Sequence, residues 1–227
     1  FFITGNIPAA ELKPLVEKYI GSLPATDSRE KWVDWGIRPP RGKQEQEIEF
    51  MGLPSSIVVL SMTREMDYNI RHNICLEALK SILQTRCMNV IREKEGGTYA
   101  VNVNQGVVYE PVAQYSMIVE FQCDPLNAAK LKGIVYGELE RLRQQVPSRD
   151  ELMMALNSIR KKEGEARESN VYWQEKLVLY YRTGLNQADV REFEEIVDKL
   201  TPEDFLEFVR EFWENVDITD VVFKPKS

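Results

Sequence analysis

The sequence predicts an α+β fold. From Lys43 to Cys123 it contains segments in which polar and apolar residues alternate or β-branched residues cluster, which is typical of strands. One long helical segment interrupts them, and amphipathic helical segments dominate the remainder. The 227 residues are 43% hydrophobic and 29% charged, as expected for a folded chain that forms one large domain or two small ones.

Charge and hydropathy exclude two classes of partner. The formal net charge of -7 disfavours nucleic acid, whose binding proteins carry a basic surface. No apolar run approaches the roughly 20 residues that a membrane-spanning helix needs. We therefore expect no nucleic acid and no membrane among the partners.

The first 42 residues precede the α+β region. Phe1 to Thr4 is apolar and reads as a strand, and Ala9 to Ile20 has the periodicity of a helix. The chain begins inside this apolar run without a basic segment, so we expect a strand cut from a longer chain rather than a signal peptide. Residues 24–42 are rich in proline and glycine and read as a linker.

Four strands and a helix are predicted between the linker and residue 123. Gln44 to Phe50 and Ser56 to Met62 are predicted strands, the second because it is apolar and β-branched. Tyr68 to Lys94 has a period near 3.6 and predicts a helix of about 25 residues. Tyr99 to Gln105 and Gln114 to Cys123 then alternate as strands.

The last hundred residues are predicted to be mostly helical. A helix starts at Pro125 to Asn127, and Ser148 to Glu151 is a capping box that opens the next helix. The remaining predicted elements are helices at Val171 to Tyr181 and Ala188 to Leu200, a break at Gly184, a helix start at Thr201 and Pro202, and a strand at Ile218 to Phe223.

Histidine and cysteine suggest no metal or nucleophile site. His72 is the one histidine in the sequence, and neither H-E-x-x-H nor H-x-x-E-H occurs. Cys75 and Cys87 are 12 residues apart on one predicted helix, about 18 Å along its axis, which is too far for a disulfide. We expect these two and Cys123 to be buried small residues, and we expect no metal in this chain.

The most informative motif is Arg92-Glu93-Lys94-Glu95-Gly96-Gly97-Thr98-Tyr99, at the end of the long helix. Two glycines allow the chain to reverse between Arg92 and Tyr99. The guanidinium and the phenol could then donate hydrogen bonds to one carbonyl oxygen and stabilise an oxyanion there. The alternative is an ordinary helix end followed by a strand tyrosine, and spacing alone does not decide between them.

Two segments resemble the insulinase/pitrilysin metallopeptidases, also called inverzincins. Residues 2–24, FITGNIPAAELKPLVEKYIGSLP, are similar to that family's strand–helix segment with G-N and P-L-V-E-K-Y. Residues 86–100, RCMNVIREKEGGTYA, are similar to its R-E-x-x-G-x-x-Y segment. The arrangement between and after them also fits, so the resemblance covers essentially the whole chain.

The resemblance implies a fold and different roles for the two halves of the parent protein. Active members of this family are clamshells of two halves, each built from two α+β domains with a mixed or antiparallel sheet and helices mainly on one face. One half binds zinc through H-x-x-E-H and a downstream glutamate. The other half contributes an arginine and a tyrosine to the scissile region, and Arg92 and Tyr99 match those positions. This chain lacks H-x-x-E-H, so its expected cofactor, zinc, belongs to the missing N-terminal part of the parent protein.

The resemblance also implies domain boundaries and partners. Residues 1–23 would be the last strand and helix of a preceding family domain, 24–42 the linker, and 43–227 the C-terminal α+β domain. The expected partners are the zinc-binding half, in the same protein or in a partner subunit, and an unfolded peptide bound by strand addition. Bacterial relatives are often periplasmic, which makes the periplasm or cell envelope the expected compartment.

Three interpretations remain open at this point. The first is a fragment of a zinc metalloendopeptidase that supplies substrate clamping and oxyanion support and is inactive alone. Within it, the non-zinc half is favoured, although catalytic halves carry a related R-E-x-x-G-x-x-Y segment. The second is a scaffold or assembly subunit with a degenerate peptidase fold. The third, a free-standing ferredoxin-like binding module, is disfavoured by the truncated start of the chain.

Overall fold

The computed structural model describes residues 1–25, 33–52, 54–95, 100–186 and 189–226, with the backbone alone at residues 92–95. Contacts divide the chain into two units. The larger unit comprises Arg38–Glu163 and Asp189–Ser227, and the smaller unit comprises Phe1–Ile37 and Gly164–Ala188. The larger unit contains the sheet and most of the buried core.

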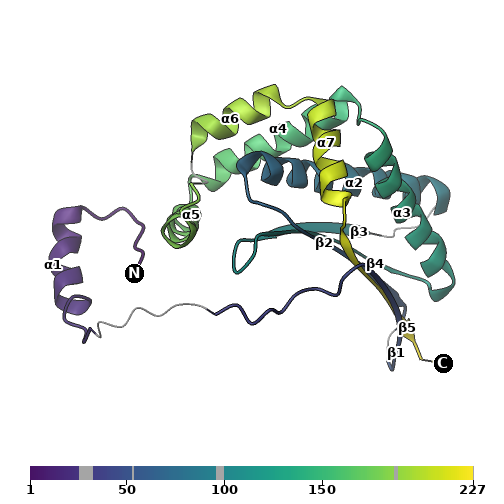
Figure 1. Ribbon diagram of the computed structural model, residues 1–227, viewed down its shortest axis with the longest axis horizontal. Coiled ribbons are helices and arrows are strands. Elements are labelled where there is room, and N and C mark those ends of the chain that lie inside the picture. Colours follow the sequence, from purple (N-terminus) through teal and green to yellow (C-terminus); the bar gives the residue numbers. More distant parts are fainter. Residues whose placement is uncertain (26–32, 53, 96–99, 187–188, 227) are drawn as a thin grey trace. The chain divides into compact units, whose positions relative to one another are not determined.

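A five-stranded mixed sheet forms the centre of the larger unit (Figure 1). The strand order is β1-β5-β2-β4-β3, with β1 parallel to β5 and every other neighbouring pair antiparallel. The strands are β1 (Lys43–Phe50), β2 (Ser56–Glu65), β3 (Val101–Val108), β4 (Gln114–Cys123) and β5 (Asp217–Pro225). All five were predicted from their residue patterns, and their observed ends differ from the predicted ones by at most three residues.

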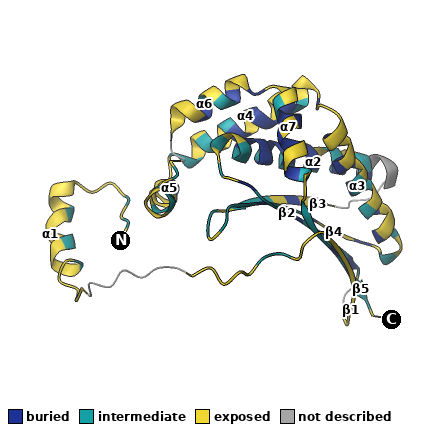
Figure 2. Cartoon of the chain, viewed as in Figure 1, coloured by how far each residue is buried: buried dark blue, intermediate teal, exposed yellow. Residues whose placement is uncertain are grey.

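The helices of the larger unit lie on one face of this sheet (Figure 1). They are α2 (Ile70–Glu95), the short 3₁₀ helix η1 (Pro125–Asn127), α3 (Ala128–Gln144), α4 (Arg149–Ala166), α6 (Val190–Lys199) and α7 (Pro202–Trp213). In β2, Val58, Leu60 and Met62 are buried while their neighbours are half-buried, so alternate side chains form the core beneath the helices. Figure 2 shows this buried layer between sheet and helices. The predicted α+β fold with helices on one face is confirmed.

Local signals in the sequence set the helix ends. Ser148 Oγ accepts a hydrogen bond from Glu151 N at 3.2 Å, and the Glu151 carboxylate accepts one from Ser148 N at 3.0 Å. This is the predicted capping box of α4. Thr201 and Asp204 form a second box at the start of α7. Because each box satisfies backbone N–H groups that have no partner inside the helix, it fixes where the helix begins.

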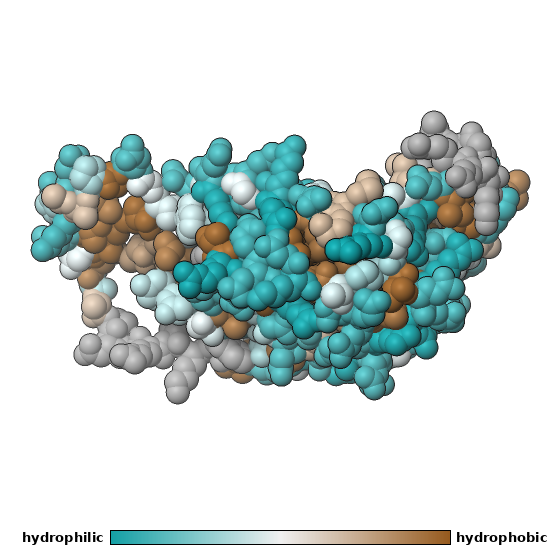
Figure 3. Space-filling view, turned by 90° about the horizontal axis from the view of Figure 1, so that it is seen from above, coloured by the Kyte–Doolittle hydropathy of each residue, from teal (hydrophilic) through white to brown (hydrophobic). Residues whose placement is uncertain are grey.

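The outward surface of the helix layer is polar. Seen from above the helices, most of the larger unit is covered by hydrophilic residues (Figure 3). No helix in the described ranges is both long and apolar enough to cross a membrane.

One charged side chain is buried in the sheet beneath the helix layer. Asp220 of β5 is 1% exposed and lies opposite Leu60 in β2. Its carboxylate accepts hydrogen bonds from Lys132 Nζ at 3.2 Å and from Tyr136 Oη at 3.1 Å, both on α3. Burial, together with the Asp220 charge, raises the pKa of Tyr136. A buried carboxylate is tolerated where a cation and a hydrogen-bond donor compensate for lost water, so this contact ties α3 to β5.

The smaller unit contains α1 (Ala9–Tyr19) and α5 (Asn170–Thr183). Thr4 Oγ1 donates a hydrogen bond to the Asn170 carbonyl at 3.0 Å, which ties the N-terminal segment to α5. α5 ends at Thr183, and Gly184, where a break was predicted, forms its C-cap with a left-handed φ of 78° that suits glycine. The strand predicted at residues 1–4 is not formed. A strand needs backbone partners on a neighbouring strand, and the described part of the chain offers none to this segment.

The Asp220 contact gives a first prediction. Replacing Asp220 with alanine leaves the largely covered Lys132 ammonium without its counter-charge, so we expect D220A to lower the free energy of unfolding by about 3 kcal/mol in urea titrations. The double variant D220A/K132M should recover much of this loss, because neither charge then remains in the core. A change below about 0.5 kcal/mol in D220A would contradict the assignment.

The Glu151 carboxylate gives a prediction about pH. Hydrogen bonds from Arg86, at 2.8 and 3.0 Å, lower the pKa of Glu151 from 4.5 to about 2. Its stabilising contribution is therefore complete above pH 4.5 and is lost as the pH falls towards 2. We expect E151Q to destabilise the fold by about 1 kcal/mol at pH 7, after discounting for its partial exposure.

Thermal unfolding from pH 7 downwards tests this expectation. The difference between wild type and E151Q should narrow below pH 4.5. The matched variant E175Q, which alters an exposed carboxylate of α5, should follow the wild type throughout. A difference between wild type and E151Q that stays constant with pH would contradict the role of the ionised carboxylate.

Candidate functional site

The predicted donor pair lies at the connection between α2 and β3. α2 ends at Glu95 and β3 begins at Val101. Arg92 lies in the last turn of α2, where the backbone is described and the side chain is not. Tyr99 lies outside the described residues. The structure therefore locates the connection, and the pairing of Arg92 with Tyr99 on one carbonyl stays a prediction.

The strand that follows this connection is an edge of the sheet. β3 pairs with β4 alone among the described strands, in antiparallel register with Val101 opposite Phe121 and Val108 opposite Gln114. Its side chains alternate, with Val101 and Val103 buried and Asn102 exposed. An edge strand presents unpaired N–H and C=O groups along its outer side, which is where an extended peptide can add.

Part of this outer side is already occupied by side chains of α2. Gln84 Nε2 donates a hydrogen bond to the Val101 carbonyl at 2.7 Å, and Gln84 Oε1 accepts one from Val103 N at 2.9 Å. Val101 N donates to the sulfur of Met88 at 3.4 Å. Gln84 is not among the residues predicted from the sequence. A glutamine on a helix carries no signal of this role, because the contact depends on how the helix and strand pack.

The cysteines are poor nucleophiles. Cys75, Cys87 and Cys123 are buried and form no disulfide. Burial raises the pKa of the Cys75 thiol and of the Cys87 thiol to about 12. A cysteine nucleophile needs a lowered thiol pKa and an exposed sulfur. The prediction that these residues are buried and structural agrees with both observations.

His72 is held among aromatic rings rather than near other metal ligands. Its ring centroid lies 5.4 Å from that of Phe208 and 6.1 Å from that of Tyr115, and its Nε2 lies 3.5 Å from the Glu211 carboxylate. Burial lowers the pKa of His72, while the Glu211 charge acts in the opposite direction. Within the described ranges, no three histidine, cysteine or acidic side chains gather as metal ligands.

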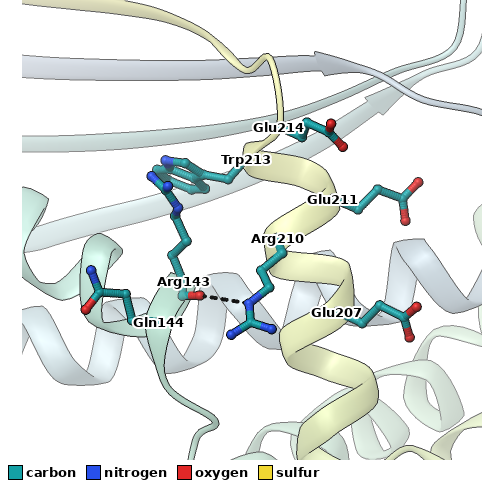
Figure 4. A pocket seen from close by; sticks show the side chains of 7 residues that line it. All are labelled: Arg143, Gln144, Glu207, Arg210, Glu211, Trp213 and Glu214. Atoms are coloured by element: carbon teal, nitrogen blue, oxygen red, sulfur yellow. Dashed lines mark hydrogen bonds between the residues drawn. The ribbon is translucent and has the colours of Figure 1, made fainter.

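A hollow of about 820 Å³ lies between the C-terminal end of α3 and α7. Arg143, Gln144, Arg210 and Trp213 lie on one side of α7, while Glu207, Glu211 and Glu214 point to its other side (Figure 4). Arg210 Nε donates a hydrogen bond to the Arg143 carbonyl at 3.4 Å. Because its polar groups do not converge on one point, the hollow lacks the arrangement expected of a catalytic site.

Comparison with known proteins identifies the family. Residues 1–159 match the sequence profile of the family described as "Peptidase M16 inactive domain". The chain belongs to this family. The solved structure of a predicted insulinase family protease from Yersinia pestis has a similar fold. It superposes on 98% of this chain with a TM-score of 0.70 and 15% sequence identity. The family match over residues 1–159 confirms the resemblance to the insulinase/pitrilysin metallopeptidases.

Two M16-like relatives indicate the context of such a domain. A probable zinc protease PqqL of Haemophilus influenzae is 28% identical over 134 residues, which cover 58% of this chain and 14% of that protein. The periplasmic protease PqqL of Escherichia coli has the same fold, with a TM-score of 0.79 and 19% identity over 98% of this chain and 25% of that one. The chain thus spans a quarter or less of these relatives.

The buried thiols of this M16 domain give a third prediction. Because folding raises the pKa of the Cys75 and Cys87 thiols and covers both sulfurs, we expect them to react with a disulfide reagent at pH 8 at least about 100-fold more slowly in the native protein than in urea. Absorbance of the released thiolate measures the rate. Rapid reaction of one thiol in the native state would reopen the possibility of a cysteine nucleophile.

Proposed function

We propose that this chain is part of a zinc metalloendopeptidase and supplies the half that clamps the substrate. The observation that carries the proposal is the edge strand β3, which begins shortly after Arg92, in the last turn of α2, and Tyr99, in the connection that follows. The match to the M16 inactive domain and the relatives named as zinc proteases support it. The chain's contribution is to bind and orient a peptide next to a zinc-binding half.

The chemistry of the proposal is electrostatic. When water attacks a peptide carbonyl, the oxygen gains negative charge, and hydrogen-bond donors fixed towards that oxygen stabilise the transition state by about 3–4 kcal/mol each. The Arg92 guanidinium and the Tyr99 hydroxyl are the proposed donors. Arg92 is carried by α2, whose buried face packs on the sheet as far as Ile91.

Zinc would come from elsewhere in the protein. The described residues contain no set of three candidate ligands, and His72 is packed between Phe208 and Tyr115. These residues do not suit a zinc ion. We therefore assign the metal to the zinc-binding half, in the same chain or in a partner subunit, and assign no step through it to this domain.

The proposed substrate is an unfolded peptide. A peptide that adds to β3 as a further strand forms main-chain hydrogen bonds, which any sequence can supply. The proposed site therefore selects an extended backbone more than particular side chains. The Escherichia coli relative is described as periplasmic, and we propose the periplasm for this protein also. We further propose that residues 1–23 complete a preceding domain, 24–42 link the domains, and 43–227 form the C-terminal domain.

A second candidate function is that of a scaffold or assembly subunit that keeps the fold for its interfaces. The description of the matched family as an inactive domain favours it to that extent. Arg92 and Tyr99 would then have no effect on catalysis. The two candidates differ in what happens when these residues are replaced in the full-length protein.

The proposal predicts a kinetic effect of Arg92 and Tyr99. In the full-length protein we expect R92Q and Y99F each to lower kcat/KM for an unfolded peptide by about 10- to 1000-fold, because each removes a donor to the developing oxyanion. Zinc content, measured by elemental analysis, should not change. The control variants R191Q and Y180F alter exposed side chains of the same types and should retain full activity.

Two outcomes would contradict the proposal. Unchanged kinetics in both R92Q and Y99F would favour the scaffold function. Chelator-sensitive peptidase activity of the isolated 227-residue chain would show that the zinc site lies in this chain after all.

A further inference from the structure

We propose that Gln84 is a positioning residue that caps half of the β3 edge and thereby sets the register in which an extended peptide adds to it. This inference rests on the proposed peptide binding at β3, and it limits the part of β3 with which a peptide can form main-chain hydrogen bonds. The capped half is Val101 to Val103, and the open half is Gln105 to Val108.

The direction of the backbone groups follows from the capping contacts. In an antiparallel ladder, residues two apart direct their N–H and C=O to the same side. The Val101 carbonyl and Val103 N–H point to Gln84 and therefore away from β4. By this alternation the N–H and C=O of Gln105 and Val107 also point away from β4, and no described strand pairs with them there.

The Gln84 amide takes the place of a peptide group. It donates to one carbonyl and accepts from the N–H two residues later, at 2.7 and 2.9 Å, as the main chain of a neighbouring strand does. In addition, the sulfur of Met88 accepts a hydrogen bond from Val101 N. The start of β3 is therefore already satisfied, and an added strand gains new main-chain hydrogen bonds only from Gln105 onward.

The open half carries an unsatisfied acceptor. Oε1 of Gln105 is buried and has no hydrogen-bond donor among the described residues. A buried acceptor without a partner is costly and is rare in native proteins. A hydrogen-bond donor supplied by a ligand next to this part of β3 would satisfy it.

The two edge strands of the sheet differ in how readily a further strand can pair with them. The other edge, β1, reads Lys43-Gln44-Glu45-Gln46-Glu47-Ile48-Glu49-Phe50, and its charged side chains discourage strand addition. The open half of β3, Gln105-Gly106-Val107-Val108, is uncharged. It is too short to stabilise an edge-to-edge dimer of this negatively charged chain, so we assign its occupant as an extended peptide and not a second copy.

The test uses the full-length protein with chelator present, and a fluorescent unstructured peptide of about ten residues, long enough to span β3. Peptides carrying a single N-methyl group at successive positions report which peptide N–H groups are used. In wild type we expect methylation to weaken binding only where the peptide pairs with Gln105 and Val107. In Q84A the sensitive region should extend two residues farther, and the unmethylated peptide should bind about fivefold more tightly.

Matched variants separate the possible failures. Q84E keeps an acceptor for Val103 N–H and loses the donor, so its methylation pattern should lie between those of wild type and Q84A. Q145L alters an exposed glutamine at the end of α3 and should change nothing. V107P removes a single outward N–H, which an edge strand tolerates, and should weaken binding about tenfold. Thermal unfolding checks that each variant is folded.

Each contrary outcome has one meaning. If V107P and N-methylation leave binding unchanged, peptides do not add to β3 and the proposed clamp itself fails. If V107P weakens binding but Q84A keeps the wild-type methylation pattern, the clamp stands and the register role of Gln84 is overturned. If Q84A forms dimers in sedimentation experiments without a change in peptide binding, Gln84 guards against self-association and the inference is wrong.

Discussion

The packing of α2 against the sheet is the constraint on which the rest of the candidate site depends. Nine apolar residues of this helix are almost fully covered: Ile74, Cys75, Leu76, Ala78, Leu79, Ile82, Leu83, Cys87 and Ile91. Burial of such a face is the main source of stability of a helix in a folded domain. Because the helix cannot rotate without exposing this face, the position of Gln84 beside β3 and of the backbone at Arg92 is fixed by hydrophobic packing.

The sheet and the helices contribute to the site in different ways. The sheet supplies main-chain groups, whose positions follow from strand register, and α2 supplies side chains, whose positions follow from helix packing. The two meet along β3, where Gln84 and Met88 bond to backbone atoms. In the proposed function, the strand selects a peptide in extended conformation and the helix sets its register.

Short-range features were predictable from the sequence and long-range ones were not. The predicted capping box at Ser148 and the predicted helix start at Thr201 depend on local hydrogen bonds, and both occur. The insertion of β5 between β1 and β2 joins segments about 170 residues apart, and no local pattern encodes it. The contact of Asp220 with Lys132 was also missed, although an acid directly before the apolar run Val221 to Phe223 was a usable signal. Spacing predicted Arg92 and Tyr99 as a possible donor pair, and family resemblance favoured this role over an ordinary helix end.

The strand order has a consequence for how the domain folds. β1 and β2 are close in the sequence, yet β1 touches the sheet only through β5, which comes after every helix. During synthesis, β2, β3 and β4 can pair as soon as they emerge, whereas β1 has no neighbour until Asp217 to Pro225 has left the ribosome. The polar, charged composition of β1 keeps it soluble during this interval. Completion of the sheet is therefore a late, high-contact-order event.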